Sequence, residues 1–417
     1  MPTQAPVLLR NHRPFVAFWF ARIFTASGFQ MLTVAIGWNL YQLTGNVLDL
    51  GLIGLVEFAP RVLFMLHTGH VADRYDRRKI AALCQTAQAL IALALFIGST
   101  TDSVTREMIF ILAFALGASR AFEMPATQAL LPSIVPSSLF PRAVASAQSA
   151  QQTATIVAPA LGGFLYAFGS SWVYGPTVLL YVIACGLMLS LPARQMALNK
   201  GKATLDSLMA GIRFIRSRPD VLGAISLDLF AVLLGGATAL LPVFASDILL
   251  TGPWGLGLLR SAPAVGALGM SLWLAHFNVE RKVGRVMFTA VGVFGVATIA
   301  FGLSTSFWFS LAVLVVLGAA DMISMVIRAS FVQLETPDEM RGRVSAVNGL
   351  FIGASNQLGE FESGLTAHWL GTVPAVVLGG VGTLAVTGIW IKLFPTLANR
   401  DRMRDVVEEA EVQKAPV

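Results

Sequence analysis

The chain has 417 residues, of which 55% are hydrophobic and only 12% are charged, and its formal net charge at pH 7 is +6. Soluble globular domains carry about 25% charged residues, so this composition excludes an ordinary soluble fold and indicates a membrane protein. The positive charge does not indicate nucleic-acid binding, because no basic stripe interleaved with aromatic residues occurs. The expected partners are the lipid bilayer and a small molecule.

Long apolar stretches follow one another along the whole chain, and they are too continuous for the alternating strands of a membrane barrel. We therefore predict an all-α polytopic membrane protein with twelve transmembrane helices. The predicted spans are 15–43, 49–71, 80–100, 107–132, 143–168, 173–193, 220–248, 255–277, 286–303, 307–333, 344–368 and 373–395. The first stretch is too long and too polar for a signal-peptide core, so we expect it to stay in the chain.

The basic residues outside the spans are distributed unevenly between the two sides of the membrane. Most of the 29 Lys and Arg residues lie in the two tails and in alternate connections, whereas Arg106 is alone in the opposite connections. Cytoplasmic loops collect Lys and Arg, so this asymmetry predicts that both termini are cytoplasmic.

One long polar stretch, from Arg194 to Pro219, separates six spans from six. The predicted organisation is an N-terminal half at 1–194, a cytoplasmic linker at 195–218, a C-terminal half at 219–396 and a cytoplasmic tail at 397–417. Apolar residues at helical spacing inside the linker predict a surface helix there.

The two halves repeat each other about 200 residues apart, which indicates a duplicated six-helix unit. Matching pairs include Pro136 with Pro337, Arg142 with Arg343, and Gly163 with Gly364. Parallel repeats of this kind predict a central site between the halves, opened alternately to the two sides of the membrane.

Two motifs carry a resemblance to a known family. The turn Gly69-x-x-x-Asp73-Arg74-x-x-Arg77-Arg78 resembles the loop 2–3 signature of the major facilitator superfamily, except that Asp76 replaces the usual glycine. The run 158–163, Ala-Pro-Ala-Leu-Gly-Gly, resembles the antiporter motif of proton-coupled drug exporters, although alanine occupies its three leading glycine positions. With the segments 337–344 and 356–360, the whole chain resembles the enterobactin-exporter-like branch.

The resemblance implies that the charged turn is a conformational latch. The residues concerned are Gly69, Asp73, Arg74, Arg77 and Arg78. Asp73 is expected to follow the second span and to dock at the positive N-terminus of the eleventh span, near Arg343. The alternative is that these residues form only a basic turn that sets the membrane orientation.

The antiporter-like motif consists of Ala158, Pro159, Gly162 and Gly163. Proline kinks a helix and small residues let a neighbouring span come close. In the family this motif accompanies export by antiport. The alternative is ordinary packing of small residues.

In this superfamily the first, fourth, seventh and tenth spans line the cavity. Their ionisable residues here are Arg22, Arg120, Glu123, Asp228, Asp321 and Arg328. Ionisable groups inside a membrane are costly and usually functional, so we expect a proton relay, with Glu123 and Asp321 as the first carriers. Arg120 with Glu123, and Asp321 with Arg328, share a helix face and are alternatively structural ion pairs. Arg22 and Asp228 lie at similar depth in related helices and are expected to pair across the cytoplasmic half when that side closes.

Uncharged polar residues in the spans are candidates for substrate binding. They are Gln30, Asn39, Asn348, Asn356 and Gln357.

The sequence therefore predicts a proton-driven exporter of a small organic compound, either a siderophore or a drug-like molecule. An uptake symporter with the same fold is the alternative. An enzyme is not expected, because the chain has no phosphate-binding loop signature and its five histidines are scattered. No metal or cofactor is expected, since the proton gradient is the driving force, and we expect a monomer in a bacterial inner membrane.

Overall fold

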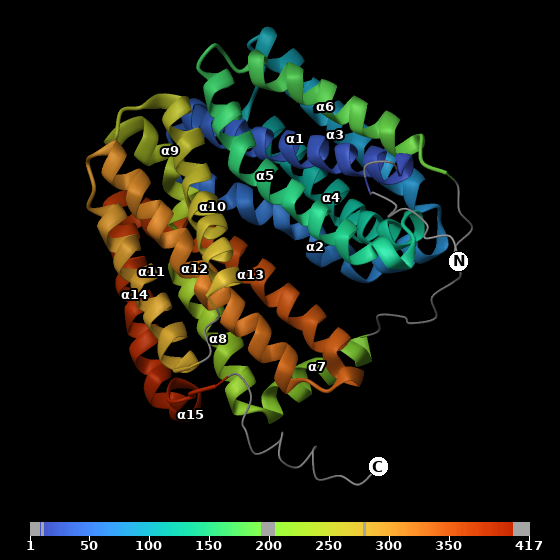
Figure 1. Cartoon of the computed structure of the whole chain (residues 1–417). Helices are drawn as coiled ribbons and strands as arrows, with labels where there is room; N and C mark the ends of the chain where they lie inside the picture. The colour runs from blue at the N-terminus through green and yellow to red at the C-terminus, as the bar shows by residue number, and fades with distance from the viewer. Residues whose placement is uncertain (1–8, 10–11, 193–204, 278–280, 403–417) are drawn as a thin grey trace, which may run out of the picture. The chain divides into compact units, whose positions relative to one another are not determined.

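The computed structural model describes residues 9, 12–192, 205–277 and 281–402, and within these ranges it contains helices and no strands (Figure 1). The all-α prediction is confirmed. The helices are α1 (Arg13–Thr44), α2 (Val47–Arg74), α3 (Arg77–Thr100), α4 (Arg106–Ile134), η2 (Ser137–Leu139), α5 (Phe140–Tyr166), α6 (Ser171–Leu189), α7 (Leu205–Ser217), α8 (Pro219–Leu234), η3 (Ala237–Leu240), α9 (Leu241–Val243), η4 (Phe244–Ile248), α10 (Gly252–His276), α11 (Val283–Gly302), α12 (Phe307–Glu335), α13 (Asp338–Leu370), α14 (Thr372–Leu393) and α15 (Pro395–Ala398).

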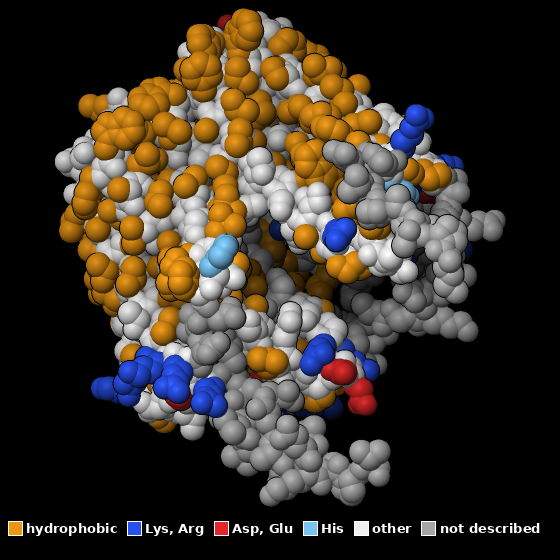
Figure 2. All heavy atoms as spheres, in the orientation of Figure 1, with side chains coloured by type: hydrophobic (Ala, Val, Ile, Leu, Met, Phe, Trp, Pro, Cys, Tyr) orange, Lys and Arg blue, Asp and Glu red, His pale blue; other side chains and the backbone are white. Residues whose placement is uncertain are grey.

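Among the described residues, nine segments are long and apolar enough to cross a membrane. The count of twelve spans stays a prediction, because α2, α5 and α13 do not meet that criterion although each is 27 residues or longer. These three helices carry more polar and charged side chains, which lowers their hydropathy. Large apolar side chains are nevertheless exposed over much of the surface, as Figure 2 shows, and Leu83 and Trp308 are 72% and 70% exposed.

Contacts divide the chain into two compact units. The first unit comprises 1–203 and 241–261, and the second comprises 204–240 and 262–417. The short segment 241–261 thus belongs with the first unit. The half boundaries expected from the sequence stay predictions, and the stretch 193–204 of the expected linker lies outside the described residues.

In the first unit, α1 packs against α5 and α6, α3 packs against α6 and α4, and α2 packs against α4. The α2–α4 contact is close because Gly117 has no side chain, and a Cβ there would overlap the backbone of Glu57. The core residues Tyr174 and Tyr181 of α6 are fully buried.

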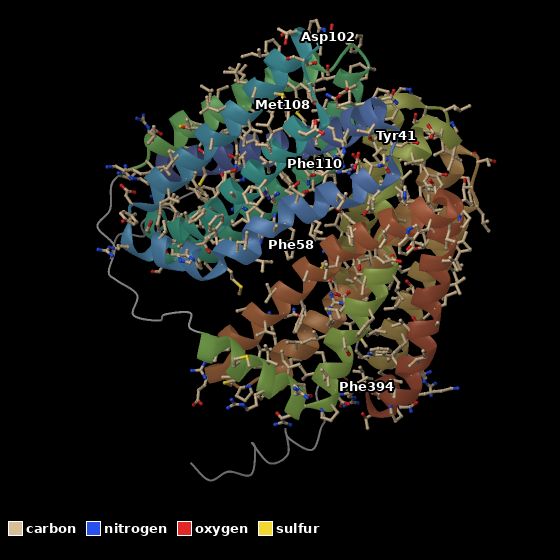
Figure 3. The ribbon with its side chains drawn as sticks, turned by 180° about the vertical axis from the view of Figure 1, so that it is seen from behind. Tyr41, Phe58, Asp102, Met108, Phe110 and Phe394 are labelled. Carbon is tan, nitrogen blue, oxygen red and sulfur yellow. The ribbon has the colours of Figure 1, made fainter. Side chains whose placement is uncertain are left out.

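In the second unit, α11 packs against α12 and α14, and α8 packs against α13 and α14. The linker helix α7, expected from the sequence, is present and lies on α13, where a Cβ at Gly211 would come within 2.9 Å of the Arg343 carbonyl oxygen. Phe394, labelled in Figure 3, follows the last residue of α14 and packs against Gly223 of α8.

The predicted span 220–248 corresponds to one candidate membrane segment, Pro219–Ile248, but its backbone is not one continuous α-helix. Helix α8 ends at Leu234, and the chain passes through Gly235 and Gly236 into a short 3-10 turn and then a π-helical turn. Gly236 lies so close to Gly359 of α13 that any side chain there would overlap its backbone. Irregular backbone is tolerated inside a membrane where protein covers it or where it lines a cavity.

The segment after α14 folds back as a clip on the end of the second unit. Arg400, whose side chain is 12% exposed, binds Asp220 of α8 at 3.2 Å and Glu335 of α12 at 2.5 Å. The next residue, Asp401, accepts a hydrogen bond from the backbone N–H of Lys282 at 3.1 Å. Since the first N–H groups of a helix lack partners, this contact caps α11.

Candidate functional site

A cavity of about 510 Å³ lies wholly within the first unit. Arg22 and Thr25 of α1, and Arg120 and Glu123 of α4, line it. Arg22, Arg120 and Glu123 were all predicted from the sequence as cavity residues. A cavity of this size falls in the range of about 300–1,000 Å³ typical of small-molecule sites.

Glu123 is held by two glutamine side chains that the sequence reasoning missed. Gln85 donates to its Oε1 at 3.2 Å and Gln88 donates to its Oε2 at 2.8 Å. All three residues are buried, with Glu123 6% exposed and Gln88 0%. The available signal was that Gln85 and Gln88 lie three residues apart on one face of an otherwise apolar span.

Arg120 and Glu123 do not form the ion pair that their spacing suggested. Within the described ranges, no ion pair of either residue is closer than 4.0 Å, since Arg120 instead lies over the ring of Phe29, 3.5 Å from its centroid. Arg22 donates to Thr127 and to Gln151, in each case at 3.4 Å. The amides and hydroxyls of α3, α4 and α5 thus supply most polar contacts of this cavity.

The second unit has its own cavity, of about 290 Å³, beside the break in the seventh span. Gly235, Gly236, Asp321, Asn356 and Glu360 are among the residues that line it. Two carboxyl groups and the irregular backbone therefore face one space.

Arg328 forms its ion pair with Asp228 of α8 and not with Asp321, the alternative that their shared helix face offered. Both partners are buried, at 4% and 9% of side-chain exposure. Asp228 is thereby engaged within its own unit, and its expected pairing with Arg22 stays a prediction. In the described part of the chain, Asp321 has no ion pair.

The charged turn after α2 is built around its arginines. Arg77, 8% exposed, donates to the carbonyl oxygens of Ala72 at 3.0 Å and Ala129 at 2.9 Å, and so ties α2 to α4. Arg74 is exposed and Gly69 has open space around it. Asp73 lies in the last turn of α2, and its side chain is outside the described residues.

Asp76, where the signature has glycine, caps the N-terminus of α3. Its Oδ1 accepts from the Arg78 backbone N–H at 3.0 Å, and its carboxylate pairs with the Arg78 side chain at 2.7 Å. The hydrogen bond from the Arg78 side chain lowers the pKa of Asp76 below its ordinary value. The departure from the family pattern therefore has a local structural role.

The motif in α5 makes the close contacts expected of small residues. A Cβ at Gly162 would come within 3.0 Å of Met31 of α1. A Cβ at Gly163 would overlap the backbone of Pro253 and come within 2.8 Å of Gly257, at the start of α10. Ala158 and Pro159 are buried in the same helix.

The candidates for substrate binding are scattered. Asn39 donates to Tyr174 at 3.2 Å and Gln30 donates to Thr155 at 3.4 Å, so both are engaged inside the first unit. Of the five, Asn356 lines a described cavity. Asn348 and Gln357 each hold a buried amide oxygen without a hydrogen-bond partner among the described residues.

A family model described as transmembrane secretion effector matches residues 3–414. The chain belongs to this family of the major facilitator superfamily. Among curated proteins, it is 26% identical over 386 residues to the enterobactin exporter EntS of Citrobacter koseri, covering 90% of this chain and 87% of that protein. It is 25% identical over 379 residues to EntS of Escherichia coli O1:K1, with the same coverage.

Solved structures support the fold. The nucleoside transporter NupG aligns with a TM-score of 0.68 at 15% identity, over 91% of this chain and 99% of that one. A bacterial homologue of the iron transporter ferroportin, in an inward-facing state, aligns with a TM-score of 0.71 at 18% identity, over 94% and 100%. This transmembrane secretion effector is thus a multi-pass membrane transporter and not an enzyme.

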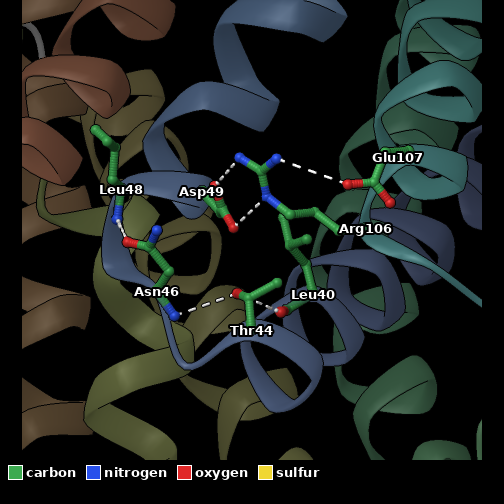
Figure 4. A network of polar contacts seen from close by, with 7 residues as sticks. All are labelled: Leu40, Thr44, Asn46, Leu48, Asp49, Arg106 and Glu107. Atoms are coloured by element: carbon green, nitrogen blue, oxygen red, sulfur yellow. Dashed lines mark hydrogen bonds and ion pairs between the residues drawn. The ribbon is translucent and has the colours of Figure 1, made fainter.

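At the end of the first unit that holds the α1–α2 turn, this transporter has a polar network (Figure 4). Asp49 in the first turn of α2 is 1% exposed and accepts two hydrogen bonds from Arg106 of α4, at 2.6 and 2.8 Å. Asn46 caps α2 by accepting from the Leu48 N–H at 3.0 Å. At the same turn, the Tyr41 hydroxyl donates to Asp247 of η4.

We expect Arg106→Gln to lower the melting temperature of the purified transporter, because it removes the counter-charge of a buried carboxylate. Differential scanning fluorimetry in detergent measures this shift. Glu107→Gln is the matched control, since Glu107 is 72% exposed and lies 4.0 Å from the same guanidinium. Equal melting temperatures for the two variants would show that Asp49 does not need its partner.

Proposed function

We propose that this transporter is a proton-driven exporter of a small organic compound, either a siderophore or a drug-like molecule. The observation that carries the proposal is Glu123, a buried carboxylate that lines a cavity large enough for such a compound. Ionisable groups in spans are retained where protons or substrates pass. Asp321 supplies a carboxylate to the cavity of the second unit.

Two observations favour export over uptake. The curated relatives named above are exporters by name, and the motif in α5 resembles that of antiporters and brings α5 close to the start of α10. The chain requires no cofactor in this proposal, because the proton gradient supplies the energy. The proposed orientation has both termini in the cytoplasm of a bacterial cell, and the excess of basic residues in the tails and alternate connections supports it.

The test is the sign of the proton movement in vesicles that contain the purified protein and an internal pH dye. Substrate entering the vesicles by antiport drives protons out, so the interior becomes more alkaline. Entry by symport, the alternative function, makes the interior more acidic. A panel of siderophores and amphipathic drugs supplies the candidate substrates, and the absence of any substrate-dependent pH change across it would contradict proton coupling.

The latch is a separate proposal. We expect Asp73→Asn to slow transport cycling while leaving substrate affinity nearly unchanged, since a carboxylate at a helix N-terminus contributes up to about 2 kcal/mol to one conformation. Transport rate and equilibrium binding are measured on the same preparation. Asp102→Asn, at an exposed turn between α3 and α4, is the control. A normal transport rate in Asp73→Asn would contradict the latch and indicate that the charged turn only sets the membrane orientation.

A further inference from the structure

Two guanidinium groups in the first-unit cavity, those of Arg22 and Arg120, make no ion pair within 4.0 Å among the described residues. The hydrogen bonds of Arg22 are long, at 3.4 Å, and go to the uncharged side chains of Thr127 and Gln151. Arg120 lies over the face of Phe29, and its buried Nε has no hydrogen-bond partner in the described part of the chain. Arg22 is attracted to Glu123 and repelled by Arg120. Arg120 is also attracted to Glu57.

Glu123 attracts both arginines electrostatically. Glu123 uses its two oxygens to accept from the amides of Gln85 and Gln88, and within the described ranges it makes no ion pair with either arginine. Of the described residues that line the cavity, two are positive and one, Glu123, is negative. The cavity therefore has a surplus of positive charge, and its guanidinium donors are not saturated by the residues that the structure describes.

Charges in a low-dielectric site are normally paired and hydrogen-bonded. We propose that this cavity binds an organic anion whose acidic group lies between Arg22 and Arg120. The arginine fork suits carboxylate, sulfonate, phosphate and phenolate oxygens, because it offers several N–H donors in one plane. Gln148 and Gln151 supply further hydrogen-bonding groups, and Phe18 and Phe140 supply apolar surface in the same cavity.

The inference rests on the proposed function and narrows its substrate class. A cationic drug would meet two guanidiniums and one carboxylate in this cavity, so acidic compounds are selected over amphipathic cations. The charge preference belongs to the first-unit cavity alone, because the second-unit cavity is lined by Asp321 and Glu360.

The test uses two dyes of similar skeleton and opposite charge, fluorescein and rhodamine 6G. Their binding to the protein in nanodiscs of zwitterionic phosphatidylcholine is followed by fluorescence anisotropy at pH 8 without a pH gradient. We expect saturable binding of fluorescein at least about tenfold tighter than that of rhodamine 6G. Arg22→Gln and Arg120→Gln should each weaken it about 10- to 100-fold, the range of a lost hydrogen bond to a charged group.

Three further variants make the test independent of folding. Glu123→Gln removes the carboxylate from the cavity and should strengthen fluorescein binding several-fold. Arg142→Gln removes an exposed arginine of α5 and should leave binding unchanged. Arg22→Lys keeps the charge and should retain most of the affinity.

Equal or tighter binding of rhodamine 6G, no binding of fluorescein, or unchanged affinity in both arginine-to-glutamine variants would overturn the inference. Because the measurement needs no proton movement, its failure is distinct from failure of the exporter proposal, which the vesicle assay reports. Loss of proton movement with retained fluorescein selectivity would contradict the exporter proposal and leave the anion site intact.

Discussion

Glu123→Gln should reduce substrate-driven proton movement to the level of protein-free vesicles, while the protein still folds. The substitution preserves the size of the side chain, and an amide oxygen can still accept from Gln88. It removes the group that can bind and release a proton in the cavity. The vesicle assay with an internal pH dye measures this, and size-exclusion chromatography checks folding.

Asp321→Asn should likewise reduce substrate-driven proton movement to the level of protein-free vesicles, because it also removes a carboxylate that lines a cavity. Asp321 lines the cavity of the second unit, while the nearby Arg328 is already paired with Asp228. A carboxylate that borders a cavity in a membrane without an ion-pair partner among the described residues is suited to exchange protons. If one substitution abolishes proton movement and the other does not, the carrier is the residue whose loss matters.

Glu107→Gln is the matched control for Glu123, because it makes the same chemical change at an exposed position of the same helix. Its proton movement should equal that of the unaltered protein. Full proton movement in both Glu123→Gln and Asp321→Asn would contradict the proton relay altogether.

The second large effect is expected at the buried Asp228–Arg328 pair. Arg328→Gln should reduce the free energy of unfolding by about 3–5 kcal/mol, because it leaves a buried carboxylate unpaired. Asp228→Asn should cost less, since Asp321 is close enough to interact with the arginine that remains. The double variant should be more stable than Arg328→Gln, as both charges are then removed.

Denaturant unfolding of the purified variants, compared as a double-mutant cycle, measures these differences. Asp220→Asn is not a suitable control, because Asp220 binds Arg400. Glu339→Gln, at an exposed position of α13, is preferable. A double variant as unstable as the sum of the two single variants would indicate that the pair does not couple.

The fold class followed from hydropathy alone, because runs of about 20 apolar residues have few alternatives to a membrane helix. The count of twelve spans stays a prediction, since helices such as α2 and α5 carry polar side chains along with apolar ones. The adjacent glycines 235 and 236 were the available signal for the break in the seventh span. Hydropathy does not reveal them, because glycine is neither strongly apolar nor strongly polar.

The cavity residues were predictable as a set, because charges within spans stand out. The ion-pair and hydrogen-bond partners of these residues were not predictable from the sequence. Arg328 lies on the same helix face as Asp321, yet it pairs with Asp228 from a helix about 100 residues away in sequence, a choice set by interhelical packing. Gln85 and Gln88 were missed because uncharged amides are common in spans, and only their contact with Glu123 distinguishes them.

The clip formed by Arg400 and Asp401 behaves as a ligand tethered to its own receptor. It reaches α8, α11 and α12 through a short covalent connection, so its effective concentration at that site is far above any value for a free peptide. A peptide of residues 395–402 supplied to a chain cut after Leu393 would therefore have to be present in large excess to replace it.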